Sequence, residues 1–241
     1  MKVEKMNNLI IPEHIALIPD GNRRWARQRS LAPWRGHRAG AKATDNFVKW
    51  CLELKIPQIS VWIGSTENIS GRPKREVEEL YKLYYEFLSQ WEKDKTKSML
   101  EKYKIKVRFI GDIEKLPPKL VRLMGKIMRN TANNQKRILN VMINYGGKFE
   151  LLETFKKVAN KMIKAGKIEI TEKDIESNLF VQTPVDLVLR TGGQNRLSNF
   201  MLWQAAYAEI YVTKILLPDF SKKEFMKAIR WYSSVKRNFG K

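Results

Sequence analysis

The sequence comprises 241 residues, enough for one large domain or two small ones, and 46 basic against 25 acidic residues give it a net charge of +21. This charge makes nucleic acid, an anionic membrane surface and phosphorylated small substrates plausible partners. The single cysteine, Cys51, excludes an internal disulfide and favours a reducing, cytoplasmic setting. With two histidines and one cysteine a zinc site is improbable, and no apolar stretch approaches the roughly 20 residues that span a bilayer.

Six short apolar runs alternate with helical patterns along the chain. Such alternation predicts a mainly parallel sheet flanked by helices, so we expect an α/β fold with a central sheet of about six strands. No internal repeat or linker divides the sequence, and residues 1–241 are expected to form a single domain. The predicted strands are residues 15–18, 59–63, 107–110, 139–143, 187–189 and 209–212.

Two amphipathic helices are predicted between the first three strands, over residues 41–54 and 73–100. The second begins at Pro73, a residue that suits the first position of a helix, and repeats large apolar side chains at three- and four-residue spacing. Core packing explains most of both apolar stripes, but stripes this aromatic could also line an apolar cavity, and we expect an apolar tunnel beneath these two helices. Further helices are predicted over residues 120–130, 149–164 and 221–232.

A polar turn, Asp20 to Arg24, follows the first strand. Its backbone N–H groups could face an anion, and its two arginines add positive charge. A lone carboxylate would repel phosphate, so Asp20 fits there if it holds Mg²⁺ that bridges to a diphosphate; the alternative is an ordinary helix cap. Because ligands of parallel sheets bind at the carboxyl ends of the strands, the loops after the strands should form one site.

Two further polar segments are candidates for that site. Arg35 and His37 come shortly after the helix that is expected to follow the Asp20–Arg24 turn, where they either reach the same anion or belong to a solvated basic loop. Residues 65–68, Ser-Thr-Glu-Asn, end the second strand and suit hydrogen bonding to a substrate, although turn and capping roles explain them equally. Arg72 is followed by Pro73, and taken alone this pair indicates only the start of a helix.

The loop Arg190 to Phe200 carries two arginines, two glycines and a serine directly after the fifth strand. Glycine lets backbone N–H groups turn toward a ligand, and guanidinium groups suit phosphate oxygens. We expect a helix after this loop, with its positive end directed at the same anion; the alternative is an exposed polar turn. Glu209 begins the last strand, where a carboxylate is either a surface residue or a cation ligand.

These segments form a set of motifs in a fixed order: Asp-Gly-Asn-x-Arg-Trp-Ala, Gly-His-x-x-Gly, Ser-Thr-Glu-Asn, Arg-Pro-x-x-Glu-Val, Asn-Tyr-Gly-Gly and Arg-Thr-x-Gly-x-x-Arg-x-Ser-Asn-Phe-x-x-Trp-Gln-x-x-Tyr-x-Glu. The set resembles the cis-prenyltransferases, of the undecaprenyl and dehydrodolichyl diphosphate synthase type, over nearly the whole chain. The resemblance implies condensation of isopentenyl diphosphate with an allylic diphosphate, such as farnesyl or geranylgeranyl diphosphate, to give a Z-polyprenyl diphosphate. It also implies Mg²⁺ as cofactor and a homodimer.

The resemblance assigns roles by position. It implies that Asp20 and Asn68 act at the reacting centre, that Asp20 binds Mg²⁺, and that Glu209 completes the metal site, in the family often from the neighbouring subunit. The positions around Asp20 would bind the allylic diphosphate, and the loop after Arg190 would bind isopentenyl diphosphate. The substrate-binding residues implied are Gly21, Asn22, Arg23, Arg24, Trp25, Arg35, His37, Ser65, Glu67, Asn68, Arg72, Arg190, Arg196 and Ser198.

Some positions depart from the family pattern. Arg23 stands where bacterial members usually have glycine, Pro33 stands in place of an arginine that Arg35 would have to replace, and Gln194 replaces a frequent glutamate. These departures bear on substrate preference more than on activity.

Two alternative functions predict different residues in the sequence. A non-catalytic activating subunit of a heteromeric enzyme would lack Asp20 and the loop arginines, which this chain keeps. Nucleic acid is not expected as a partner, because the arginines cluster at strand ends beside Asp20. An apolar product together with the net charge suggests peripheral contact with an anionic membrane.

Overall fold

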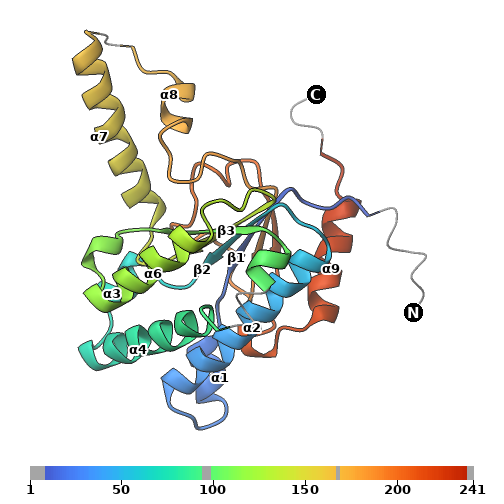
Figure 1. Ribbon diagram of the computed structural model, residues 1–241. Coiled ribbons are helices and arrows are strands. Elements are labelled where there is room, and N and C mark those ends of the chain that lie inside the picture. The colour runs from blue at the N-terminus through green and yellow to red at the C-terminus, as the bar shows by residue number, and fades with distance from the viewer. Residues whose placement is uncertain (1–8, 94–98, 167–168, 238–241) are drawn as a thin grey trace.

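A computed structural model describes residues 9–93, 99–166 and 169–237. Within this part of the chain, six strands form one sheet in the order β3-β4-β2-β1-β5-β6, with every neighbouring pair parallel (Figure 1). The prediction of a six-stranded parallel sheet flanked by helices is confirmed. The strands are β1 (His14–Ile18), β2 (Gln58–Trp62), β3 (Ile105–Ile110), β4 (Arg137–Met142), β5 (Leu187–Arg190) and β6 (Glu209–Val212).

The strand order reverses at β1, the strand that pairs with β2 on one side and β5 on the other. At such a switch point the connections leave in opposite directions and open a crevice beyond the carboxyl ends of the strands. Ile18 pairs with Arg190 in register, so the loops that follow β1 and β5 start side by side. The fold therefore places Asp20 next to the arginine loop.

The five helices predicted by range are present in the expected order, but two differ in extent. Two short helices, at residues 66–70 and 172–176, were not predicted. Helix α2 begins at Pro33, so Arg35 and His37 lie in its first turns and not in a loop; Pro33 is at the position where proline favours a helix start. Helix α4 ends at Gln90, and the next residue, Trp91, packs against Phe109 of β3. Residues 94–98 of the longer predicted helix lie outside the described residues. The helices are α1 (Asn22–Arg27), α2 (Pro33–Glu53), α3 (Thr66–Ser70), α4 (Lys74–Gln90), α6 (Pro118–Asn130), α7 (Gly147–Ala165), α8 (Glu172–Glu176) and α9 (Lys222–Ser234), with 3₁₀ turns η2 (Ile113–Lys115) and η3 (Leu217–Asp219).

The expected helix after the arginine loop is absent, since residues 198–207 form turns and bends. Ser198, Asn199 and Met201 have positive φ angles of 54°, 68° and 44°, which a right-handed helix excludes. The prediction of a helix N-terminus directed at this site is therefore wrong. Instead, Asn199 accepts hydrogen bonds from the first backbone N–H groups of α7, those of Gly147 (2.6 Å) and Lys148 (2.8 Å).

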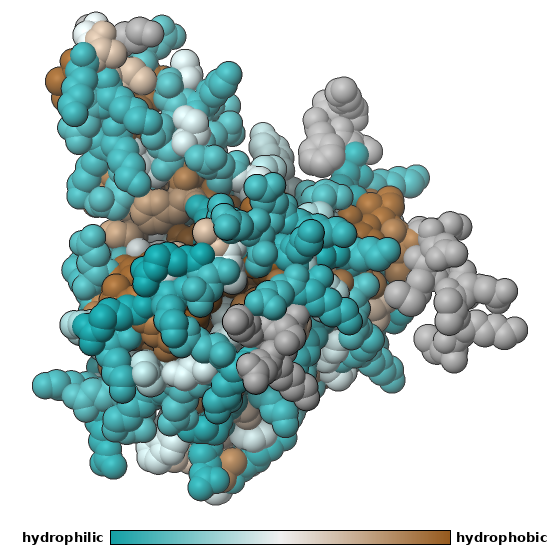
Figure 2. All heavy atoms as spheres, viewed as in Figure 1, coloured by the Kyte–Doolittle hydropathy of each residue, from teal (hydrophilic) through white to brown (hydrophobic). Residues whose placement is uncertain are grey.

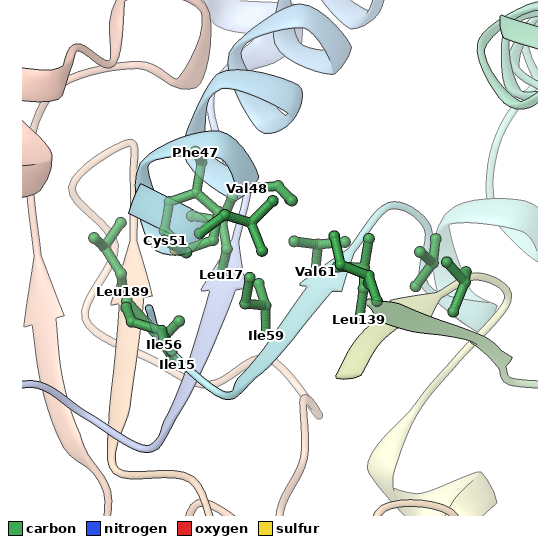
Figure 3. Packing of buried hydrophobic residues seen from close by; sticks show 14 of the residues in the cluster. Ile15, Leu17, Phe47, Val48, Cys51, Ile56, Ile59, Val61, Leu139 and Leu189 are labelled. Atoms are coloured by element: carbon green, nitrogen blue, oxygen red, sulfur yellow. The ribbon is translucent and has the colours of Figure 1, made fainter. Parts of the chain in front are cut away.

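The larger part of the core lies between one face of the sheet and helices α2, α4, α6 and α9. Figure 3 shows Phe47, Val48 and Cys51 of α2 packed over side chains of β1, β2 and β4. Cys51 is fully buried in this core, and burial raises the pKa of its thiol. This packing fixes α2, and with it His37, above the carboxyl end of β1.

The opposite face of the sheet is covered mainly by the irregular segments 177–185 and 197–208. Trp62 stacks on Phe200 there, with ring centroids 5.0 Å apart. Helix α7 packs against α8 and projects from the body as an arm (Figure 1). Hydrophilic residues cover most of the face seen in Figure 2, and a hydrophobic area at the base of this arm is among the apolar patches on that face. None of the helices in the described ranges combines the length and apolar character needed to span a bilayer.

Candidate active site

A cavity of about 1080 Å³ extends from the carboxyl edge of the sheet to the start of β3, between α2 and α4. Charged and polar side chains line one end, among them Asp20, Arg24 and Arg190. The remaining wall is mostly apolar and is formed by side chains such as Leu83, Phe87, Leu88, Trp91, Val141 and Ile105. The cavity therefore matches an amphiphile with an anionic head and a long apolar tail.

Asp20 lies at the charged end, between two arginines from different elements. Its Oδ1 is 3.1 Å from a guanidinium nitrogen of Arg24 on α1, and its Oδ2 is 3.1 Å from one of Arg190 on β5. The Thr191 hydroxyl fixes the backbone of Asp20, accepting from its N–H (2.9 Å) and donating to its carbonyl (2.7 Å). The carboxylate is thus held by both halves of the site, and Asp20 does not cap α1.

The arginine loop is organised by Arg190, which is 4% exposed. One of its guanidinium nitrogens donates to Ser198 Oγ (2.8 Å) and to the carbonyl oxygen of Arg196. Gly192 has φ +83°, and a Cβ there would lie 2.4 Å from a guanidinium nitrogen of Arg24, so this position requires glycine. Close packing of the two loops accordingly depends on Gly192.

Arg196 lies at the rim of the site, exposed to solvent. Its guanidinium donates to the side-chain oxygen of Gln194 at 2.8 Å. Because Gln194 is neutral, the charge of Arg196 is not compensated by this contact, as it would be by glutamate. The departure from the family pattern at Gln194 therefore leaves the rim more positive.

Glu76, which was not predicted as a site residue, gathers three basic groups beside the cavity. Its Oε1 is 3.6 Å from Arg23, 3.6 Å from Arg72 and 3.8 Å from His37 Nε2. Burial, together with the charges of Arg72 and Arg23, lowers the pKa of His37 to about 4. His37 is thus neutral at pH 7, and its contact with Glu76 is not an ion pair.

Ser65 and Glu67 belong to a second group of contacts that joins β2 to the arginine loop. Ser65 is buried and pairs with Tyr145 in an isolated parallel bridge. Glu67 Oε1 accepts from Asn199 Nδ2 at 2.7 Å. Asn68 belongs to α3, directly after these residues. The Ser-Thr-Glu-Asn segment therefore lies against the loop that holds Ser198.

A buried carboxylate, Glu150, supports this region from the other side, and sequence reasoning did not identify it. It accepts hydrogen bonds from the Tyr145 hydroxyl, from the backbone N–H of Phe180 (2.7 Å) and from Gln204 Nε2 (2.9 Å). Burial raises the pKa of Glu150. These contacts tie the end of β4 to the segments that cover the second face.

Not every predicted site residue lies on the cavity wall. Trp25 donates its indole N–H to Asp219 (2.7 Å) and lies under the guanidinium of Arg29, while Arg35 is exposed on α2. Glu209 begins β6 and pairs with Leu187, so it lies at the amino end of the strands, whereas Asp20 follows their carboxyl end. The predicted residues that do line the cavity are Asp20, Gly21, Asn22, Arg23, Arg24, His37, Ser65, Glu67, Arg72, Arg190 and Ser198.

Several buried polar atoms at the charged end have no hydrogen-bond partner among the residues that the structure describes. They include Asn22 Oδ1, His37 Nε2 and Arg190 Nε. Since buried polar groups are nearly always hydrogen-bonded, these atoms are suited to a polar ligand. Among the described residues, no group of three or more His, Cys, Asp or Glu side chains is placed to hold a metal ion by itself.

A family model, curated relatives and a solved structure all relate this chain to enzymes that act on prenyl diphosphates. Residues 18–240 match the family model described as putative undecaprenyl diphosphate synthase. The chain is 40% identical to an isoprenyl transferase of Thermotoga maritima, over 95% of this chain and 97% of the relative. It is 36% identical to a geranylgeranyl-diphosphate-specific tritrans,polycis-undecaprenyl-diphosphate synthase of Methanopyrus kandleri, over 99% of this chain and 88% of the relative. Lavandulyl diphosphate synthase from Lavandula x intermedia, solved with dimethylallyl diphosphate, superposes with a TM-score of 0.86 at 29% identity, over 96% of this chain and 99% of that one.

Proposed function

Because the chain belongs to the undecaprenyl diphosphate synthase family, we propose that it is a prenyltransferase that condenses isopentenyl diphosphate with an allylic diphosphate to give a Z-polyprenyl diphosphate. The observation that carries this proposal is the position of Asp20 between Arg24 and Arg190, at the charged end of a long apolar cavity. A diphosphate headgroup fits the arginines, and an isoprenoid tail fits the apolar wall.

The two arginine groups divide the substrates between them. Arg23, Arg24 and the backbone from Gly21 to Asn22 hold the allylic diphosphate beside α1, with His37 in the same pocket. Arg190, Arg196 and Ser198 hold isopentenyl diphosphate. Ser65 and Asn68 lie near the reacting carbons, and Trp25 shapes the pocket indirectly through α1. Farnesyl and geranylgeranyl diphosphate are the allylic substrates proposed.

Asp20 is the residue that would bind Mg²⁺. One carboxylate suffices when substrate phosphates and water supply the other oxygens, the usual arrangement for this ion, so the residues present fit it. When bound, Mg²⁺ neutralises charge on the departing diphosphate. Arg24 and Arg190, already within 3.1 Å of Asp20, stabilise the same developing charge.

The reaction breaks the C–O bond of the allylic diphosphate and forms a C–C bond to isopentenyl diphosphate. The resulting cation then loses a proton, for which the leaving diphosphate is as suitable a base as any side chain. Apolar residues of α2 and α4 exclude water from the cation and enclose the growing chain. We propose that the cavity is the tunnel for this product and that residues 1–241 act as one catalytic domain.

A homodimer explains the position of Glu209. Glu209 lies at the opposite strand end from Asp20, so the two carboxylates could share an ion only if a second copy supplied one of them. Large apolar side chains are exposed around it, with Tyr207 85% and Ile210 42% exposed. We propose that a second copy of the chain covers this surface.

The rival function is a non-catalytic subunit that activates a different chain. Purified protein with Mg²⁺, labelled isopentenyl diphosphate and allylic primers of ten, fifteen or twenty carbons distinguishes the two. The catalytic reading predicts polyprenyl diphosphate from this chain alone, whereas absence of product with every primer supports the rival. Catalysis is proposed to occur in the cytoplasm, with peripheral contact at an anionic membrane and no nucleic-acid partner.

A further inference from the structure

One segment of the sequence combines positive charge with exposed apolar side chains. Residues 21–44 contain no acidic residue, because Asp20 and Asp45 stand just outside them. Within the same segment lie the apolar residues Leu31 and Trp34. Its seven basic residues are Arg23, Arg24, Arg27, Arg29, Arg35, Arg38 and Lys42.

The structure gathers part of this segment into one exposed surface, the turn between α1 and α2 with the first turns of α2. We call residues 27–38 the α1–α2 tip; it lies at the lower end of the molecule in Figure 1. Leu31 is 36% exposed and Trp34 45% exposed. Trp34 and Arg38 are four residues apart on α2, as are Arg38 and Lys42, so all three share one exposed helix face.

Two of the four arginines of the tip are left without a carboxylate partner among the described residues. Arg27 and Arg35 form no salt bridge with any residue of the described ranges. Arg29 pairs with Asp219 at 3.2 Å and Arg38 with Glu86 at 2.6 Å. The surface therefore presents free guanidinium groups around two exposed apolar side chains.

The tip also borders the opening of the large cavity. A surface hollow beside α1 is lined by Arg23, Arg24, Arg27, Ser30, Leu31 and Pro33. Arg23 and Arg24 line the large cavity as well. A partner bound at the tip would thus lie next to the place where the diphosphate ends of the substrates enter.

We propose that the α1–α2 tip docks the protein peripherally on an anionic lipid bilayer. Trp34 and Leu31 enter the interfacial layer, where tryptophan is favoured, and Arg27, Arg35 and Arg38 contact lipid phosphates. Each basic side chain near an anionic surface strengthens binding about five-fold. The benefit of docking rests on the proposed function, because an enzyme of apolar diphosphates gains from a site opening beside the membrane.

Another exposed apolar surface lies at the far end of the arm, where Ile163 is 77% and Ile170 47% exposed. Its charge is mixed: four lysines of α7, at positions 156, 157, 161 and 164, are offset by Glu153 and by four acids in residues 169–176, whereas residues 21–44 contain no acid. The arm is therefore less suited to an anionic bilayer than the tip. It does not line the cavity. This surface instead supplies a matched control.

The test is cosedimentation of the full chain with phosphatidylcholine vesicles, with and without phosphatidylglycerol. Wild type is expected to bind only the anionic vesicles. The double variant Leu31→Gln with Trp34→Gln should weaken vesicle binding about ten-fold or more. Arg27→Glu replaces a positive charge by a negative one, a change of two charges, and should weaken binding about 25-fold. The matched pair Ile163→Gln with Ile170→Gln should bind as wild type does. Thermal unfolding checks that every variant is folded.

Three results would overturn the proposal: no binding by wild type, equal binding of neutral vesicles, or loss of binding in the arm pair instead of the tip pair. Displacement of the protein from vesicles by duplex DNA through the same residues would identify the tip as a nucleic-acid surface and would equally overturn it. An assay of prenyl transfer in detergent, without vesicles, tests the proposed function separately from the docking of the tip on a membrane. Failure of the wild type to make product contradicts the proposed function but leaves the vesicle result standing.

Discussion

The carboxylate of Asp20 lies 3.1 Å from the guanidinium of Arg190, although 170 residues separate them in the sequence. The contact exists because Ile18 and Arg190 pair in register across β1 and β5. It joins the two loops that we assign to the two substrates. A change at either residue should therefore affect both halves of the site.

Replacement of Asp20 is the first prediction. Asp20→Asn keeps the size of the side chain but removes the charge that would bind Mg²⁺, so the rate of product formation should fall by about 10²- to 10³-fold. Initial rates with labelled isopentenyl diphosphate measure this. The control is Glu86→Gln, which removes an exposed carboxylate of α4 that pairs with Arg38 and does not line the cavity. A rate for Asp20→Asn within a few-fold of wild type would falsify the role given to Asp20.

Arg190→Lys separates charge from geometry. Lysine keeps the positive charge but cannot contact Asp20 and Ser198 together as the guanidinium fork does. The KM for isopentenyl diphosphate should rise about ten- to a hundred-fold, with a smaller effect on the KM for the allylic substrate. Steady-state kinetics with each substrate varied in turn provide the measurement. A larger increase for the allylic substrate would reverse our assignment of the two loops.

Two helical glycines give opposite expectations for stability. At Gly36 a Cβ would lie 2.1 Å from the backbone oxygen of Asn22, so Gly36→Ala must separate α2 from α1 and should cost about 2 kcal/mol or more. At Gly125 on α6 the nearest atom is the flexible end of Arg129, at 3.3 Å. Gly125→Ala should therefore be neutral or stabilise by up to about 1 kcal/mol. Denaturant unfolding of both variants compares them, and similar losses in the two would argue against close packing of α1 on α2.

Stability should depend on pH through His14. Burial lowers the pKa of His14 from 6.5 to about 4, and its ring is hydrogen-bonded to Ser60 and to the carbonyl of Pro184. Between pH 6.5 and 4 His14 takes up a proton in the unfolded chain but not in the folded one. The contribution of His14 to the free energy of unfolding is therefore fully present above pH 6.5 and is lost as the pH falls toward 4. The loss is about 3 kcal/mol for this group.

Denaturant unfolding at several pH values between 6.5 and 4, for wild type and His14→Gln, checks this expectation. The variant should show a shallower decrease of stability with decreasing pH. His37 has a similarly lowered pKa, so part of the decrease should persist in the variant. Identical slopes in the two proteins would be inconsistent with a buried, neutral His14.

The sheet and the central contacts of the site could be predicted from the sequence because they follow from strand order. Parallel strands end on one edge, so Asp20 and Arg190 could be assigned to one site. Their direct contact depends on β1 and β5 being neighbours, which was not predicted from the sequence. The backbone conformation of individual loops was harder to predict from the sequence. The arginine loop was expected to lead into a helix, but Ser198 and Asn199 adopt positive φ angles that their residue types only weakly indicate.

Residues that act through tertiary contacts were also missed. Glu76 occupies an ordinary helix-start position, and only the folded chain brings Arg23 and His37 to it. Glu150 looks like a surface residue of an amphipathic helix, yet it is buried under segments far away in the sequence. The position of Glu209 follows in the same way from β6 pairing with β5, which places it away from Asp20 within one chain.

The most direct test of the account is the size-resolved product of the purified wild-type chain, supplied with Mg²⁺, labelled isopentenyl diphosphate and farnesyl or geranylgeranyl diphosphate. We predict a Z-polyprenyl diphosphate longer than the primer, formed without any second protein and lost in Asp20→Asn. Unextended primer in every reaction of a folded wild-type protein would contradict the claim that this chain is itself the prenyltransferase.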